Sequence, residues 1–77
     1  MRIQVLGTGC AKCKQLTANA EKAVAELGLA VHVEKVEDVR EIMKFKVMST
    51  PALVVDGRVV SAGRLLAPSD VKALLQG

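Results

Sequence analysis

Residues 2–13 read RIQVLGTGCAKC, and this stretch decides the fold of the chain. The apolar residues of Arg2–Leu6 predict a short β-strand that ends at a glycine-rich turn. Behind the turn stand Cys10 and Cys13, the only two cysteines in the sequence. From Cys13 onward, apolar residues recur at spacings of three and four, which predicts an amphipathic helix from Cys10 to Leu27. The cysteine pair is therefore expected at a strand-to-helix junction.

The remainder of the chain divides into short elements. Gly28 ends the first helix, because glycine readily adopts the left-handed backbone found there. Asp38 is expected near the start of the next helix. Asp56-Gly57 lies between two apolar runs and is a strong signal for a type I′ hairpin turn. The further elements predicted are strands at Leu29–Val36, Ala52–Val55 and Arg58–Ser61, a helix at Glu37–Lys46, and a helix from about Pro68-Ser69 through Leu75.

The element order β-α-β-α-β-β-α predicts a single α/β domain over residues 1–77. The first two strands should run parallel because a long helix joins them, whereas the last two form an antiparallel hairpin. We therefore expect a mixed four-stranded sheet with helices on both faces.

Composition and charge argue against several classes of function. Phe45 is the only aromatic residue, so single-stranded nucleic acid would lack the rings on which its bases stack. The eleven basic residues are scattered, and the net charge is only +3. No segment approaches the ~20 apolar residues of a membrane span, and the N-terminus has no signal-peptide pattern. We expect a cytoplasmic monomer that binds neither nucleic acid nor membrane.

The predicted helix start gives the two cysteines different chemistry. Free N–H groups and the positive end of the helix dipole stabilise an anion there. The pKa of Cys10 should therefore lie below the ~8.5 of free cysteine, and Lys12 and Lys14 add positive charge. Cys13 lies one turn deeper, in the buried stripe of the helix. Cys10 is thus expected to attack a disulfide and Cys13 to resolve the mixed disulfide that results.

The residues by themselves do not decide between redox chemistry and other uses of the cysteine pair. The cysteines could be two small apolar residues of the core, although Cys-X-X-Cys after a strand in a cytosolic βαβ pattern is typical of redox sites. They could bind Cu(I) or supply half of a zinc site. The only histidine, His32, is expected on a strand far from the helix start. Copper chaperones of this size carry a similar pair, but their order β-α-β-β-α-β differs from the predicted one.

The chain resembles the thioredoxin superfamily, and most of all the small, glutaredoxin-sized thioredoxin-like proteins of bacteria and archaea. The resemblance rests on Cys10-Ala11-Lys12-Cys13 at the junction, on Thr50-Pro51 before the third strand, on the Asp56-Gly57 hairpin and on the turn at Gly63. It implies a thiol–disulfide oxidoreductase whose redox centre is a reversible Cys10–Cys13 disulfide, with no other cofactor and no metal. The implied partners are protein disulfide substrates and a disulfide reductase.

The resemblance also implies a substrate groove around the cysteines. Pro51 would follow a cis peptide bond and face the disulfide, and the backbone of Thr50 would pair with an extended segment of the substrate. Met48 would line the approach, with a role as core or loop filler as the alternative. The substrate-binding residues implied in this way are Ala11, Lys12, Met48, Ser49, Thr50, Pro51 and Gly63.

The sequence departs from the family pattern in three places. Gly-Cys-Ala-Lys-Cys has neither the aromatic residue nor the proline of the common Trp-Cys-Gly-Pro-Cys. Gln4 stands where thioredoxins often carry a buried acid that could take the proton of Cys13. The glutaredoxin pattern Cys-Pro-Tyr-Cys is absent, so the choice between glutathione and thioredoxin reductase as electron donor stays open. The fold could also serve one dedicated partner as a docking module, with the same dithiol chemistry.

Overall fold

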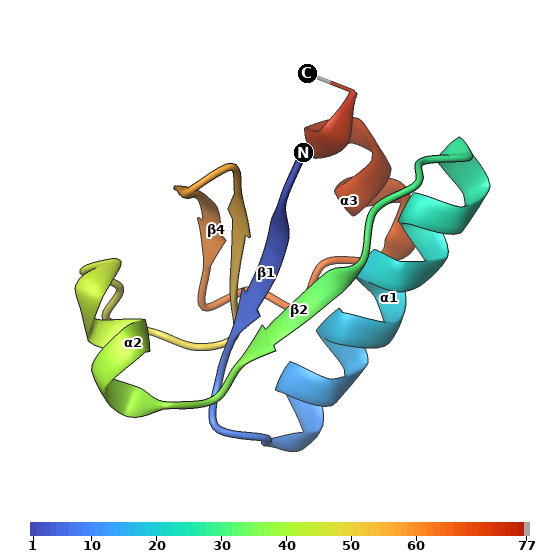
Figure 1. Cartoon of the computed structure of the whole chain (residues 1–77). Coiled ribbons are helices and arrows are strands. Elements are labelled where there is room, and N and C mark those ends of the chain that lie inside the picture. Colours follow the sequence, from blue (N-terminus) through green and yellow to red (C-terminus); the bar gives the residue numbers. More distant parts are fainter. Residues whose placement is uncertain (77) are drawn as a thin grey trace.

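The computed structural model describes residues 1–76, so Gly77, the last residue of the predicted domain, lies outside the described residues. Strands and helices follow one another in the predicted order β-α-β-α-β-β-α (Figure 1). The elements are β1 (Ile3–Leu6), α1 (Ala11–Leu27), β2 (Val33–Val36), α2 (Val39–Lys44), β3 (Ala52–Val55), β4 (Arg58–Ala62) and α3 (Pro68–Leu75).

The strands form one mixed sheet in the order β2-β1-β3-β4. β1 runs parallel to β2, with Ile3 opposite Val33, and antiparallel to β3, with Leu6 opposite Ala52. In the hairpin between β3 and β4, Asp56 and Gly57 have φ angles of 52° and 79°, and a type I′ turn requires positive φ at both positions. β1 is thus a central strand. The loop of residues 7–10, called the cysteine loop below, follows the carboxyl end of β1, between β2 and β3.

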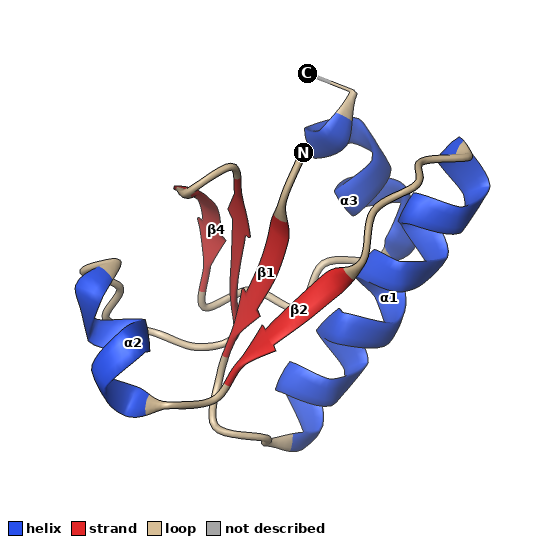
Figure 2. Cartoon of the chain, viewed as in Figure 1, coloured by secondary structure: helices blue, strands red, loops and turns tan. Residues whose placement is uncertain are grey.

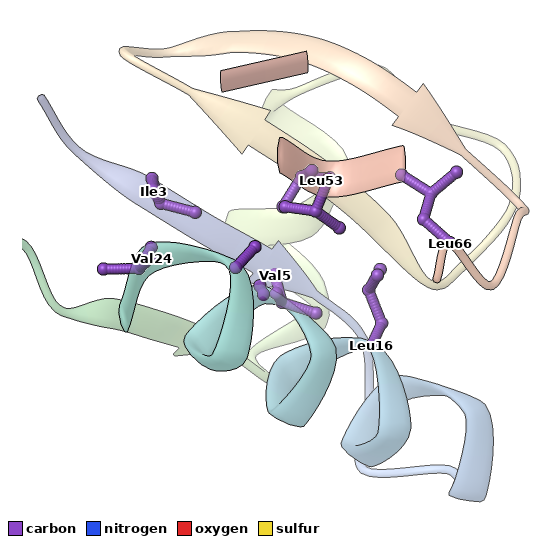
Figure 3. Packing of buried hydrophobic residues seen from close by; sticks show 9 residues of the cluster. Ile3, Val5, Leu16, Val24, Leu53 and Leu66 are labelled. Carbon is purple, nitrogen blue, oxygen red and sulfur yellow. The ribbon is translucent and has the colours of Figure 1, made fainter. Parts of the chain in front are cut away.

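Different helices cover the two faces of the sheet (Figure 2). α1 and α3 lie on one face, and α2 lies on the other, which confirms the predicted fold class. The buried residues on the α1 face, drawn as sticks in Figure 3, are Ile3, Val5, Leu16, Ala20, Ala23, Val24, Leu53, Leu66 and Val71. Those on the α2 face are Leu6, Ile42, Ala52 and Val54. Because side chains alternate along a strand, Gln4 shares the α2 face with Leu6.

The second strand is shorter than predicted, since β2 begins at Val33 and not at Leu29. β1 begins at Ile3, which pairs with Val33, so residues 29–32 have no neighbouring strand on that side. Leu29 and Val31 still pack against the core of the α1 face. Burial, and not strand pairing, therefore accounts for the apolar residues at every second position in this segment, Leu29 and Val31.

The second helix is also shorter, at Val39–Lys44 instead of Glu37–Lys46. Asp38 caps it, because its carboxylate accepts a hydrogen bond from the backbone N–H of Arg40 at 2.8 Å. Lys46 has a φ of 58°, which no α-helix can contain. The other bounds shift by one residue: β1 starts at Ile3 rather than Arg2, Cys10 caps α1 from outside, and β4 extends to Ala62.

Candidate active site

Cys10 occupies the N-cap of α1, a position that Ser, Thr, Asp or Asn usually fills. The preceding Gly9 has a φ of 87°, which lets the chain turn sharply into the helix. The sulfur of Cys10 accepts a hydrogen bond from the backbone N–H of Cys13 at 3.2 Å. The backbone carbonyl oxygen of Cys10 accepts the first helical hydrogen bond, from the N–H of Lys14 at 3.0 Å. A negative charge that forms on this sulfur would therefore meet a backbone donor and the positive end of the helix.

The two cysteines form a disulfide, and they differ sharply in exposure. Cys10 is exposed, whereas Cys13 is only 4% exposed and begins the buried stripe of α1. A partner molecule can therefore reach the sulfur of Cys10 far more easily than that of Cys13.

Gly7 allows Cys13 to approach the end of β1. A Cβ atom built on Gly7 would lie 2.9 Å from the Cβ of Cys13 and 3.9 Å from the Cβ of Thr50. Gly7 thus lies between the buried cysteine and the segment that precedes β3. Its N–H still donates to the carbonyl oxygen of Val36 at 2.9 Å, which continues the pairing with β2. Only glycine fits this position without displacing a neighbour.

Thr50 and Pro51 lie at the same end of the sheet as the cysteines. The peptide bond between them is cis, as the resemblance implied. Pro51 is fully buried, and its carbonyl oxygen accepts a hydrogen bond from the N–H of Gly63 at 2.8 Å. Because Leu6 pairs with Ala52, the antiparallel register brings Pro51 opposite the start of the cysteine loop.

Among the other predicted groove residues, Gly63 and Ser49 lie close to each other beside this pair. A Cβ built on Gly63 would lie 2.8 Å from the Cβ of Ser49, so the turn after β4 contacts the segment before Pro51. Met48 is fully exposed, so the alternative that it fills the core is wrong. Ala11 and Lys12 are exposed in the first turn of α1.

A small cavity of about 40 Å³ lies beside the buried cysteine, and the sequence did not lead us to expect it. Its lining residues are Gly9, Cys13, Lys14, Thr17, Lys35 and Glu37. Side chains alternate along a strand, so Lys35 and Glu37 have the same parity as Val31 and Val33 in the predicted strand and just after it. This parity could have indicated that Lys35 and Glu37 lie near the cysteines, but only if one already knew that this face of β2 meets the start of α1.

The marked pKa shifts belong to an ion pair at the far end of β1. Arg2 donates two hydrogen bonds to the carboxylate of Glu34, at 2.7 and 3.0 Å. These hydrogen bonds, and then the opposite charge, hold the pKa of Glu34 below its usual value and raise that of Arg2. Since Arg2 precedes β1 and the cysteines follow it, the pair plays no part in the disulfide site.

Metal ligands are sparse around the cysteines. Within residues 1–76 no group of three or more His, Cys, Asp or Glu side chains is placed to hold a metal ion. His32 is exposed, in the irregular segment before β2. The observed order of elements also differs from that of the copper chaperones considered above.

The fold and the cysteine pair at a helix start define a thioredoxin-like dithiol protein. Residues 1–76 match a protein-family model described as a thioredoxin domain. The thioredoxin of Methanothermobacter thermautotrophicus is 39% identical over 75 residues, which cover 97% of each chain. That of Methanocaldococcus jannaschii is 39% identical over 74 residues, covering 96% of this chain and 85% of the relative. The chain therefore belongs to the thioredoxin family.

A solved structure supports the same fold. This structure, described as "Structure of a malarial protein", superposes with a TM-score of 0.67, covering 99% of this chain and 96% of the other at 20% identity. With its archaeal relatives and its Cys10–Cys13 disulfide, the chain is a thiol–disulfide oxidoreductase with that disulfide as redox centre. Among the described helices, none has the length and apolar character needed to cross a membrane.

Proposed function

We propose that this protein is a cytoplasmic reductant of protein disulfides that acts as a monomer and is recharged by a disulfide reductase. Cys10 is the nucleophile and Cys13 the resolving cysteine. The observation that carries this assignment is the asymmetry of the pair, because Cys10 is exposed at a helix N-cap while Cys13 is 4% exposed beneath it. No cofactor is needed beyond the disulfide itself.

The reaction runs in two exchanges. The Cys10 thiolate attacks one sulfur of the substrate disulfide, which forms a mixed disulfide and releases the first substrate thiolate. Cys13 then loses its proton and attacks the sulfur of Cys10. The Cys10–Cys13 bond forms, the bond to the substrate breaks, and the second substrate thiolate leaves and is protonated. The substrate gains two electrons, and the protein is left oxidised.

The substrate binds as an extended segment across the end of the sheet. Thr50 is exposed beside the buried Pro51, so its backbone is free to pair with such a segment in the manner of an added strand. Met48 offers an exposed, adaptable apolar side chain at the approach. The remaining groove residues of the proposal are Ala11, Lys12, Ser49 and Gly63.

The assignment of roles is tested with dithionitrobenzoate, whose thiolate product absorbs visible light. The reduced protein should release two equivalents of this product, Cys13→Ser should release one and stop at the mixed disulfide, and Cys10→Ser should react far more slowly. If Cys13 proves the faster of the two towards an alkylating agent, the roles are reversed and the assignment is wrong.

The direction of electron flow is tested by equilibration with dithiothreitol couples, followed by alkylation and mass measurement. This readout suits a chain without Trp or Tyr. A reductant requires a potential close to the ~−270 mV of thioredoxin. A potential of ~−180 mV or above would make the protein an isomerase or an oxidant instead.

A further inference from the structure

The cavity beside Cys13 is lined by charged side chains as well as by the buried cysteine. Its volume of about 40 Å³ exceeds the ~10–15 Å³ that one water molecule requires. Thr17 is buried and donates its hydroxyl proton to the carbonyl oxygen of Cys13 at 3.0 Å. Lys14, Lys35 and Glu37 complete the polar wall. The buried Cys13 thus faces a space that is large enough for one water molecule and whose lining includes charged residues.

The carboxylate of Glu37 also contacts the cysteine loop directly. A Cβ atom built on Gly9 would lie 3.0 Å from Oε2 of Glu37. Glu37 follows β2, whose last residue Val36 accepts a hydrogen bond from the N–H of Gly7. The sheet therefore fixes the backbone of Glu37 next to the loop that carries the nucleophile.

Resolution of the mixed disulfide requires a proton acceptor at this place. Burial disfavours the charged form of a thiol, so Cys13 holds its proton until it attacks. Gln4 cannot accept that proton as a carboxylate would, and it lines a larger cavity on the α2 face rather than the space beside Cys13. Of the residues that line the cavity at Cys13, Glu37 alone carries a carboxylate.

We propose that Glu37 is the proton acceptor for Cys13, reached through a water molecule in this cavity. The inference rests on the proposed function, in which Cys13 is the resolving cysteine. As the Cys10–Cys13 bond forms, the thiol proton passes through the water to the carboxylate of Glu37, and the substrate leaves as a thiolate. The glutamic acid then returns its proton to solvent, because its side chain is exposed.

The surrounding charges fit this role. Lys14 on α1 and Lys35 on β2 line the same cavity, and their positive charge favours the thiolate that develops as Cys13 attacks. On its other side Glu37 lines the larger cavity, where the other charged groups are Arg2, Glu34, Lys35, Asp38, Glu41 and Asp56. Arg2 pairs with Glu34 and Asp38 caps α2.

The sign of the effect of Glu37→Gln separates a proton acceptor from a neighbouring charge. A carboxylate that acted only through its charge would oppose the Cys13 thiolate, so its removal would speed resolution. A proton acceptor speeds resolution, so its removal must slow it. General bases typically contribute about 10²–10⁴-fold to rate, and a loss of at least tenfold is expected.

The experiment follows the second release of nitrothiobenzoate from the reduced protein by rapid mixing between pH 6 and 8. The first phase, in which Cys10 attacks, should change less than twofold in Glu37→Gln, while the second phase slows at least tenfold at pH 6. Without the acceptor, resolution depends on spontaneous ionisation of the thiol. Because thiols ionise above this pH range, the rate of the second phase should rise about tenfold per pH unit. The wild-type protein and Glu37→Asp should show a much flatter profile.

Glu21→Gln is the matched control, since Glu21 is an exposed carboxylate on α1 that does not line the cavity. It should keep both phases and the flat profile. A second phase in Glu37→Gln that equals or exceeds the wild-type rate at every pH overturns the proposal. Cys13→Ser tests the proposed function separately from the role of Glu37. If this variant still shows a second phase, Cys13 is not the resolving cysteine, whatever the result for Glu37→Gln.

Discussion

Replacing Gly7 by alanine should weaken the protein mainly in its oxidised form. The added Cβ would lie 2.9 Å from the Cβ of Cys13, whereas carbon atoms pack best at about 3.5–4.0 Å. The nearest atoms are the sulfur of Cys13 and then its Cβ, and the Cβ cannot swing away as the end of a long side chain could. The first turn of α1 must therefore shift by roughly 1 Å away from β1.

The size of the effect follows from two opposing contributions. Overpacking in a closed core costs about 1–3 kcal/mol. Alanine restricts the unfolded chain more than glycine does, which returns about 0.4–1 kcal/mol. The net loss is about 1–2 kcal/mol, and at about 4–8 °C per kcal/mol for a domain of this size, Tm should fall by roughly 5–15 °C.

The oxidised form should lose more stability because the disulfide ties Cys13 to Cys10 and prevents the relaxation that would relieve the contact. Far-UV circular dichroism during heating measures Tm with and without excess dithiothreitol, and it needs no Trp or Tyr. Resolution by Cys13 should slow as well, since the displaced sulfur must return to Cys10.

Gly57→Ala is the control for this comparison. An added Cβ at Gly57 meets no atom within 4 Å, but its φ of +79° penalises any other residue. Left-handed backbone costs about 1–2 kcal/mol, so Tm should fall equally in both redox forms, without a change in disulfide exchange. If Gly7→Ala lowers Tm equally in both forms, or not at all, the proposed contact with Cys13 is refuted.

Two further changes test other parts of the structure. Pro51→Ala should slow reduction of a protein disulfide more than that of dithionitrobenzoate, or let copper copurify with the dithiol; no change in either would contradict a proline that faces the site. Glu34→Gln should lower Tm slightly at pH 7. Because Arg2 depresses the folded-state pKa of Glu34, that stabilisation is present above the usual carboxyl pKa and disappears as pH falls through the lowered value. The Tm values of variant and wild type should therefore converge in acid.

The elements that could be predicted from the sequence are those whose signals are local. Ala52–Val55 was predicted with its observed bounds, because the turn residues on either side delimit it. Val33 could not be predicted as the start of β2, because that start depends on where β1 begins. Strand length is set by the partner strand, whereas hydrophobic alternation reports only which side chains face the core.

The site divides in the same way. The roles of Cys10 and Cys13 rest on their place at a helix start, and the glycine-rich turn before them predicts that start from the sequence. The steric need for Gly7 did not show there, because it arises only when α1 packs Cys13 against the end of β1 in the folded chain.

The position of the proton acceptor follows from the alternation of side chains in the sheet. Cys13 is a buried residue of α1, the helix that packs on the sheet face carrying Val5. Gln4 is one residue away from Val5 along β1 and so faces the α2 side. Even a carboxylate at position 4 would lie across the sheet from the cavity at Cys13. In β2, Lys35 pairs with Val5 and therefore shares its face, and the same parity brings Glu37 to that side at the end of the strand. The sheet thus places Glu37, and not residue 4, within reach of the buried thiol.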